Sequence, residues 1–252
     1  MIYWGVLIAA SIFGTNTGDF LSEYLKLGNV TGLPYLLVLL VGIFIWERFS
    51  PVASAAFFWA AIIVIRTGAT NIADWTHQLG IYGLILVPLI IAAFVFAVRY
   101  YAARLGGVVR DAPKVDAVYW LCMALAGIFG TLLGDFSSAG LALASYGIGT
   151  LLGTTTGGFS FSWFWVGQLI GSVIFGLAMV YMFRRHGLTG LARPAIYWTM
   201  IALIRTAGTA MGDFLAHTSL TRPGSTVLTG VVFAGLVYGF YVQRQGNQAL
   251  AA

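Results

Sequence analysis

Residues 12–20 of this chain read Ile-Phe-Gly-Thr-Asn-Thr-Gly-Asp-Phe, and residues 128–136 read Ile-Phe-Gly-Thr-Leu-Leu-Gly-Asp-Phe. The two segments differ only at their fifth and sixth positions, so the same motif occurs in both parts of the chain. Internal repeats decide a fold, because each copy is one structural unit that buries its apolar face against its neighbours. The aspartate of this motif recurs at equivalent positions elsewhere in the chain.

Four aspartates anchor four copies of the repeat: Asp19, Asp74, Asp135 and Asp213. Fifteen residues before each lies a tryptophan that follows another aromatic residue, in Tyr3-Trp4, Phe58-Trp59, Tyr119-Trp120 and Tyr197-Trp198. Four residues before each lies a threonine: Thr15, Thr70, Thr131 and Thr209. Glycine or alanine stands five residues and one residue before each, at Gly14/Gly18, Ala69/Ala73, Gly130/Gly134 and Gly208/Gly212. Small residues at this spacing let helices approach closely in a membrane.

The four copies also pair into two homologous halves, residues 1–112 and 113–252. The second and fourth copies share Ile-Arg-Thr at 65–67 and 204–206, and each has a histidine after its aspartate, His77 and His217. The aspartate spacing is 135 − 19 = 116 for the odd copies and 213 − 74 = 139 for the even copies. The difference of 23 residues predicts an insertion in the third repeat, near Ala139.

Composition places the chain in a membrane. Of its 252 residues, 60% are hydrophobic and 8% are charged, and the mean hydropathy is +0.90. A soluble domain carries about 25% charged residues, so a soluble enzyme, a disordered protein and a nucleic-acid-binding protein are excluded. The single cysteine, Cys122, excludes a disulfide framework. We expect no cofactor, and we interpret the N-terminus as a retained helix rather than a signal peptide.

Eight apolar segments predict an all-α membrane protein built from four helical hairpins. They lie at about 2–20, 33–47, 54–74, 80–99, 116–135, 162–183, 195–213 and 225–243. With both termini in the cytoplasm, the cytoplasmic side collects Arg48, Arg99, Arg104, Arg110, Lys114, Arg184, Arg185, Arg193 and Arg244, and the other side holds Lys26 and Arg222. We expect a ninth apolar stretch, Ala139–Gly157, not to cross the membrane, because a crossing there would place Arg184, Arg185 and Arg193 on the outer side. Its serine, threonine and glycine content favours a broken, non-spanning segment, either re-entrant or on the outer surface.

The tryptophan-threonine-aspartate repeat resembles a family of bacterial inner-membrane proteins defined by a fourfold repeat of unknown function, called uncharacterised membrane-anchored proteins. The resemblance covers nearly the whole chain. It implies a multi-pass protein of the bacterial inner membrane, with the lipid bilayer as its first partner; a second copy of the chain stays open as another. It implies no substrate and no catalytic residue, so the function must be argued from the residues.

The aspartates are the strongest functional signal, because half of the eight acidic residues occupy this one repeat position. An ionisable residue inside a span costs about 2.5–3.5 kcal/mol and marks a functional site by default. Each threonine lies one helical turn below its aspartate on the same face, and Asn16 and Asn71 add amide oxygens in the first half. Such oxygens suit hard cations or protons. We therefore predict a cation-binding set, with the four aspartates as candidate metal ligands.

The predicted function is a secondary transporter or channel for a small cation, either a divalent metal or a proton-coupled substrate. The amide oxygens predict that Asp19 and Asp74 matter more than Asp135 and Asp213. Motifs of intramembrane aspartyl proteases, nucleotide-binding loops, serine hydrolases and zinc proteases are absent from the sequence, so we expect no enzyme.

Arg66 and Arg205 leave alternatives open. They lie eight residues before their aspartates, near the expected membrane centre. They would form a gate or ion pairs with aspartates of neighbouring repeats, or hold an anionic or lipidic ligand in a membrane-embedded binding or enzyme module. In a third interpretation the aspartates only lock the repeats of a structural membrane protein together. The tryptophans are expected in the aromatic belt at the cytoplasmic interface.

The topology gives the first testable prediction. Reporter fusions at Ala252 and in the loop after Arg185 are expected to show cytoplasmic reporter activity, because the basic residues gather on that side. Activity at either site of a reporter that works only in the periplasm would contradict the eight-span arrangement.

Overall fold

The structure is a computed structural model that describes residues 2–50, 55–104, 115–155, 157–160, 162–190, 193–218 and 220–249, without the side chains of 188–190 and 244–249. Its helices are α1 (Ile2–Asp19), α2 (Leu33–Phe49), α3 (Ala55–Gln78), α4 (Ile81–Arg104), α5 (Ala117–Leu151), α6 (Ser162–Gly190), α7 (Pro194–His217) and α8 (Arg222–Ala249), with a π-helix, η1 (Phe20–Tyr24), after α1. The described residues contain no strand, so the all-α prediction is confirmed for them. Arg110, Lys114 and the predicted boundary between the halves lie outside the described residues.

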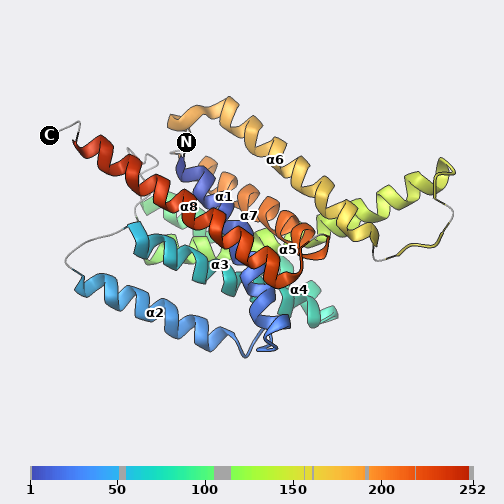
Figure 1. Ribbon diagram of the computed structural model, residues 1–252, viewed down its shortest axis with the longest axis horizontal. Coiled ribbons are helices and arrows are strands. Elements are labelled where there is room, and N and C mark those ends of the chain that lie inside the picture. Colours follow the sequence, from blue (N-terminus) through green and yellow to red (C-terminus); the bar gives the residue numbers. More distant parts are fainter. Residues whose placement is uncertain are drawn as a thin grey trace.

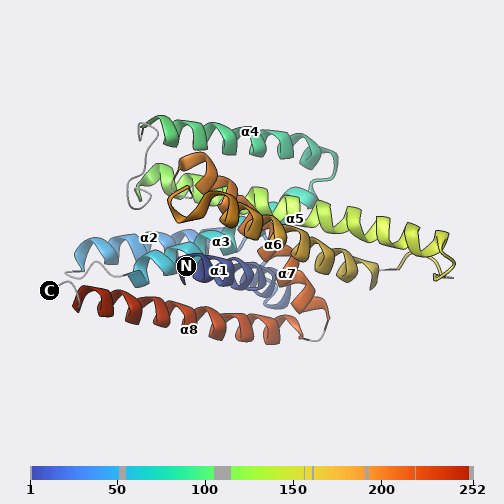
Figure 2. The ribbon, with the colours of Figure 1, turned by 90° about the horizontal axis from the view of Figure 1, so that it is seen from above.

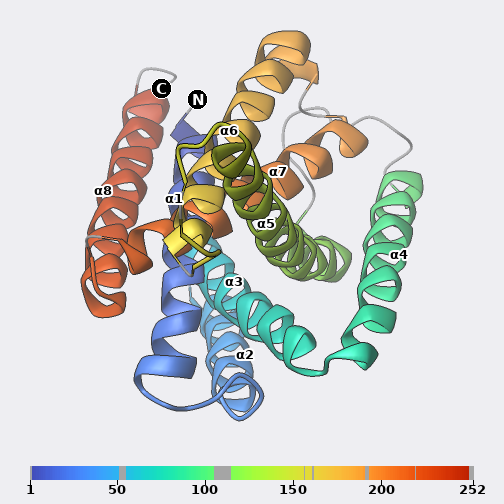
Figure 3. The ribbon, with the colours of Figure 1, turned by 90° about the vertical axis from the view of Figure 1, so that its right-hand side faces the viewer.

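The helices that carry the repeat motif form the centre of the molecule. α1 packs against α3, α3 against α5, α5 against α7, and α7 against α1. Each remaining helix packs on the central helix of the following repeat: α2 on α3, α4 on α5, α6 on α7, and α8 on α1. Figure 3 looks along the bundle and shows α2, α4, α6 and α8 at its periphery. The last repeat thus packs against the first, and the central helices form a closed ring.

The small residues of the motif set the close approach between central helices, as the sequence predicts. A Cβ added at Gly134 would lie 2.9 Å from the Cβ of Thr209, and one at Gly18 would lie 3.0 Å from the Cβ of Thr70. In both contacts, the glycine directly before the motif aspartate of one repeat lies against the motif threonine of a neighbouring repeat. Gly212 makes the same contact with Thr15 across the junction of the last and first repeats. The repeat therefore specifies one helix crossing that is used around the ring.

The aromatic pairs form a second layer of contacts between repeats. The first aromatic residue of each pair lies against the tryptophan of the next repeat, with ring centroids 5.4–5.7 Å apart: Tyr3 on Trp59, Phe58 on Trp120, Tyr119 on Trp198 and Tyr197 on Trp4. The expected interfacial belt is wrong for three of the tryptophans, since Trp4 is 9% exposed, Trp59 is 2% exposed and Trp198 is 1% exposed. Packing between repeats, which a single helix does not reveal, buries them.

The peripheral helices present apolar side chains outward. None of the residues of α2 is buried, and α4 exposes most of its length. In the described part of the chain, five helices are long and apolar enough to cross a membrane: Ala55–Gln78, Ile81–Arg104, Ala117–Leu151, Ser162–Gly187 and Arg222–Gln243. An apolar exterior around a more polar centre is the arrangement expected of a bundle in lipid, where hydrocarbon replaces water as the surrounding medium.

The inserted segment differs from the prediction. The expected broken segment at Ala139–Gly157 is a direct continuation of α5 as far as Leu151, followed by a loop. Figures 1 and 2 show this end of α5 and the beginning of α6 projecting together beyond the other helices. Close contact between α6 and α5 supports the continuation, since a Cβ on Gly167 would overlap the backbone oxygen of Ser138. Gly140, Gly147 and Gly149 lie within this helix, so the glycine content of the segment does not break it.

Gly130 provides a test of the central crossings. A Cβ at Gly130 would overlap the Cβ of Arg205, so Gly130→Ala is expected to lower stability by about 1–3 kcal/mol through overpacking. Gly140→Ala is the matched control on the same helix, since its Cβ would enter open space. The control is expected to be neutral or slightly stabilising because alanine favours helix more than glycine does. Thermal unfolding in detergent measures both variants, and equal midpoints would contradict the packing described.

Candidate functional site

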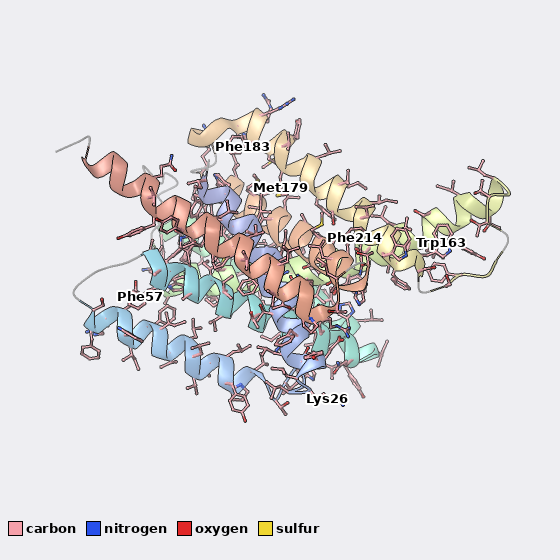
Figure 4. The ribbon with its side chains drawn as sticks, in the orientation of Figure 1. Lys26, Phe57, Trp163, Met179, Phe183 and Phe214 are labelled. Carbon is pink, nitrogen blue, oxygen red and sulfur yellow. The ribbon has the colours of Figure 1, made fainter. Side chains whose placement is uncertain are left out.

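The repeat motif runs from a tryptophan end to an aspartate end of the central helices. The tryptophan end holds the four aromatic pairs, and the aspartate end holds Asp19, Asp74, Asp135 and Asp213. In Figure 4, Phe214, which follows Asp213, lies toward the right with Trp163, whereas Phe57 lies at the opposite end of the bundle. Between the two ends the centre of the ring contains two arginines and several hydroxyl groups.

The structure brings the four aspartates into one neighbourhood. The charge of Asp213 interacts with those of Asp19, Asp74 and Asp135, and Asp74 interacts with Asp19 and Asp135. All four side chains are partly exposed. Within the described residues, no hydrogen bond is made by these carboxylates, and Asp135 alone lies within ion-pair distance of a basic side chain, the Nε2 atom of His77 at 3.6 Å, which is charged only when protonated. The carboxylates therefore form an accessible acidic layer.

Arg66 lies at the centre of the ring and is fully buried. Its Nη1 atom donates to the hydroxyl of Thr131, and its Nη2 atom donates to those of Thr15 and Thr209, all at 2.6 Å. These are the motif threonines of the three other repeats. One guanidinium thus joins α1, α5 and α7 to its own helix, α3.

Backbone oxygens complete the surroundings of Arg66. Its guanidinium donates to the carbonyl oxygens of Ser11 at 3.4 Å, Gly127 at 3.2 Å and Arg205 at 3.4 Å. These residues lie eight before their aspartates, the position that Arg66 occupies in the second repeat. The small side chains of Ser11 and Gly127 leave space at the centre, which four arginines at this position would not have.

Arg205 occupies the same repeat position but faces the tryptophan end. Its Nη2 atom lies 3.1 Å from the sulfur of Met123, and its charge interacts with Tyr3, Tyr119 and Tyr197. The hydroxyl of Tyr197 is 2.7 Å from that of Tyr3 and 3.0 Å from that of Tyr119. Arg205 is 1% exposed, and its Nε and Nη1 atoms have no hydrogen-bond partner. The two equivalent arginines therefore have different surroundings.

These contacts correct two expectations about the centre of the ring. No ion pair joins Arg66 or Arg205 to an aspartate in the part of the chain described; hydroxyl and carbonyl oxygens take that place for Arg66. The sequence predicts that the hydroxyl oxygens of Thr15, Thr131 and Thr209 bind a cation. In the structure these hydroxyls accept hydrogen bonds from the guanidinium of Arg66. Thr70 faces its own helix, where its hydroxyl donates to the carbonyl oxygen of Arg66 at 3.3 Å.

The two asparagines lie away from this centre. Asn16 donates from Nδ2 to Thr229 on α8 at 3.3 Å. Asn71 lies between Gly18 and Gly32, and neither end of its amide has a partner. The reason for expecting Asp19 and Asp74 to matter more than the other aspartates is therefore lost, because the amides add no oxygens around Arg66.

Sequence reasoning missed several residues of this centre. The tyrosines were visible as three of the four residues that precede the motif tryptophans, but only the structure shows their hydroxyls meeting. Comparison of the position eight before each aspartate, which reads Ser11, Arg66, Gly127 and Arg205, would have shown that two small residues alternate with two arginines. Among the described residues, no group of three or more histidine, cysteine, aspartate or glutamate residues is placed to hold a metal ion.

Comparison with known proteins supports the internal repeat. The model of a family described as Repeat of Unknown Function (DUF347) matches residues 2–51 and 196–245. These stretches contain the first and fourth predicted copies, which are in contact as α1 and α7. No curated protein and no solved structure matches the chain.

The threonines give a test of the centre. Thr131→Val removes the hydroxyl that accepts from Nη1 of Arg66, and Thr209→Val removes one of the two hydroxyls that accept from Nη2. Hydrogen bonds to charged groups are worth about 1.5–3 kcal/mol. Each variant is expected to be destabilised by about that amount. Thr70→Val is the control from the same repeat position, because its hydroxyl does not contact the guanidinium. Reversible unfolding in mixed micelles measures all three, and an equal loss in Thr70→Val would show that the guanidinium contacts do not stabilise the fold.

Proposed function

We propose that this chain is a secondary transporter for a small cation and that it crosses the membrane eight times, as four hairpins in two homologous halves, 1–112 and 113–252. The closed packing of the helices supports this arrangement, since the second helix of each repeat packs on the first helix of the next. The exterior of the peripheral helices is apolar, which suits contact with lipid.

The three helices outside the set of five candidates fit this arrangement for separate reasons. α1 and α7 carry the polar motif residues and are enclosed by other helices, so they need not be strongly apolar themselves. α2 has 17 residues, or about 26 Å at 1.5 Å per residue, close to the thickness of about 30 Å of a hydrocarbon core. The excess of basic residues in the connections at the tryptophan end favours a bacterial inner membrane with both termini in the cytoplasm.

The observation that carries the proposal is the acidic layer above a buried guanidinium. If the aspartates only locked repeats together, each would be expected to pair with an arginine or a backbone donor. Instead they are partly exposed, and in the described residues His77 is the single ion-pair partner of the group. Clustered carboxylates at a protein surface attract and concentrate cations.

Arg66 favours a transporter over an open channel. A guanidinium at the centre of the ring, beneath the carboxylates, is an electrostatic barrier to a cation that follows the axis. A cation can then pass along the axis only after a conformational change moves the Arg66 guanidinium or screens its charge. The absence of a metal-binding group among the described residues favours a proton-coupled cation over a bare divalent metal, which prefers six or more oxygen ligands.

A binding module for an anion is the second candidate, and one observation favours it. The guanidinium of Arg205 is buried with two nitrogen atoms unpartnered, and a buried charge without a partner is costly. A small anion beside Arg205 and the tyrosine hydroxyls would remove that cost. Arg205→Met would abolish such binding, whereas cation uptake through the acidic layer would not require a positive charge there.

Uptake by proteoliposomes tests the transport proposal. Asp→Asn at each of the four motif positions is expected to slow cation uptake by about tenfold or more, if each carboxylate stabilises the passing cation by at least 1.4 kcal/mol. Glu47→Gln, at the end of α2 away from the acidic layer, is the charge-matched control and is expected to transport normally. Uptake that is unchanged in all four aspartate variants would exclude the acidic layer from transport.

A further inference from the structure

A cavity of about 290 Å³ opens at one side of the acidic layer, between α3, α5, α6 and α7. Two motif carboxylates line it, those of Asp135 and Asp213, together with the imidazole of His77. The cavity is at the lower end of the range of about 300–1,000 Å³ for small-molecule sites. It therefore has room for a small organic ion and is larger than one bare metal ion requires.

Two buried oxygen atoms in the cavity wall have no partner. Gln168 is 8% exposed and Ser138 is 4% exposed, and neither the Oε1 atom of the first nor the Oγ atom of the second has a hydrogen-bond partner among the described residues. Both residues line the same cavity as the two aspartates. Because polar groups withdrawn from water are normally hydrogen-bonded, these atoms indicate a ligand that fills the cavity.

The chemistry of the wall selects the ligand class. The ionised carboxylates only accept hydrogen bonds, and the amide oxygen and the hydroxyl can accept them as well, so the wall suits a ligand that donates hydrogen bonds and carries positive charge. An ammonium group has three N–H donors and no acceptor. A quaternary ammonium lacks such donors. The aromatic rings of Phe136 and Phe164 supply an apolar wall for an alkyl chain and π-faces that attract a cation.

The contact between α5 and α6 forms one wall of this site. Ser138 lies where α5 continues beyond the motif, and Gln168 lies on α6, which Gly167 brings against the backbone of α5. His77 enters from the preceding repeat and stacks on Phe136, with ring centroids 5.1 Å apart. Asp19 and Asp74, which occupy the same repeat position as the cavity aspartates, do not line the cavity.

We propose that this cavity binds a small primary amine in its ammonium form. Asp135 and Asp213 supply the counter-charge, and Gln168 Oε1 and Ser138 Oγ accept its hydrogen bonds. The inference rests on the proposed function in that it names the substrate class of the transporter. It also reverses the expected order of the aspartates, since Asp135 and Asp213 contact this ligand and Asp19 and Asp74 do not.

Calorimetric titration of the purified full-length protein with n-butylammonium tests the inference without measuring transport. We expect saturable binding of n-butylammonium and at least tenfold weaker binding of tetramethylammonium, Mg²⁺ and Mn²⁺. Gln168→Met keeps the length of the side chain and removes its acceptor, so it is expected to weaken binding by about tenfold. Asp135→Asn and Asp213→Asn are expected to weaken it at least as much. An unchanged thermal midpoint of Gln168→Met shows that the fold is retained.

Glu47→Gln, at the end of α2 and outside the cavity lining, is the matched charge control and is expected to bind n-butylammonium within about twofold of the wild type. The inference is overturned if this control loses as much affinity as the cavity variants, if Gln168→Met binds normally, or if a divalent metal binds and the amine does not. Binding of the amine without uptake by proteoliposomes would support the site and contradict transport of this ligand. Uptake of another cation without amine binding would support transport and overturn the site.

Discussion

The guanidinium of Arg66 is the contact on which the centre of this structure depends. It takes three hydroxyls and three backbone oxygens from the three repeats other than its own. A buried charge is tolerated when it is fully hydrogen-bonded, and here that condition is met only if all four central helices close around one point. The small motif residues allow the helices to approach, and the carboxylates of Asp19, Asp135 and Asp213 supply favourable charge.

Much of this arrangement could be predicted from the sequence because a repeat restricts geometry. Equal spacing of tryptophan, threonine and aspartate places equivalent side chains at equal heights, and glycine or alanine at fixed positions predicts where helices meet. The helical segments and most of their first residues follow from apolar runs, for which length and composition suffice. Most helices continue four or more residues beyond the predicted end, and α5 continues as far as Leu151. The expectation that Gly134 and Gly212 allow close packing is confirmed by their contacts with Thr209 and Thr15.

What could not be predicted depends on contacts between repeats and on residues outside them. The repeat spacing predicts the position of Arg66 along its helix. The orientation of its guanidinium depends on which hydrogen-bond acceptors of the neighbouring helices lie within reach. The burial of Trp198 arises in the same way. Gln168 could not be predicted from the repeat, because it lies on α6, outside the tryptophan-threonine-aspartate motif. The continuation of α5 to Leu151 shows that glycine content alone does not distinguish a broken helix from one that packs closely against a neighbour.

The opposite directions of Arg66 and Arg205 have a consequence for how such a ring can arise. If two identical half-chains associated as a symmetric dimer, both arginines would have the same surroundings and would compete for the same hydroxyls. Two like charges close together in a medium of low dielectric repel strongly. A single polypeptide that contains both halves removes this restriction, because substitutions in one half need not appear in the other. Covalent fusion is therefore what permits two duplicated arginines to become chemically distinct.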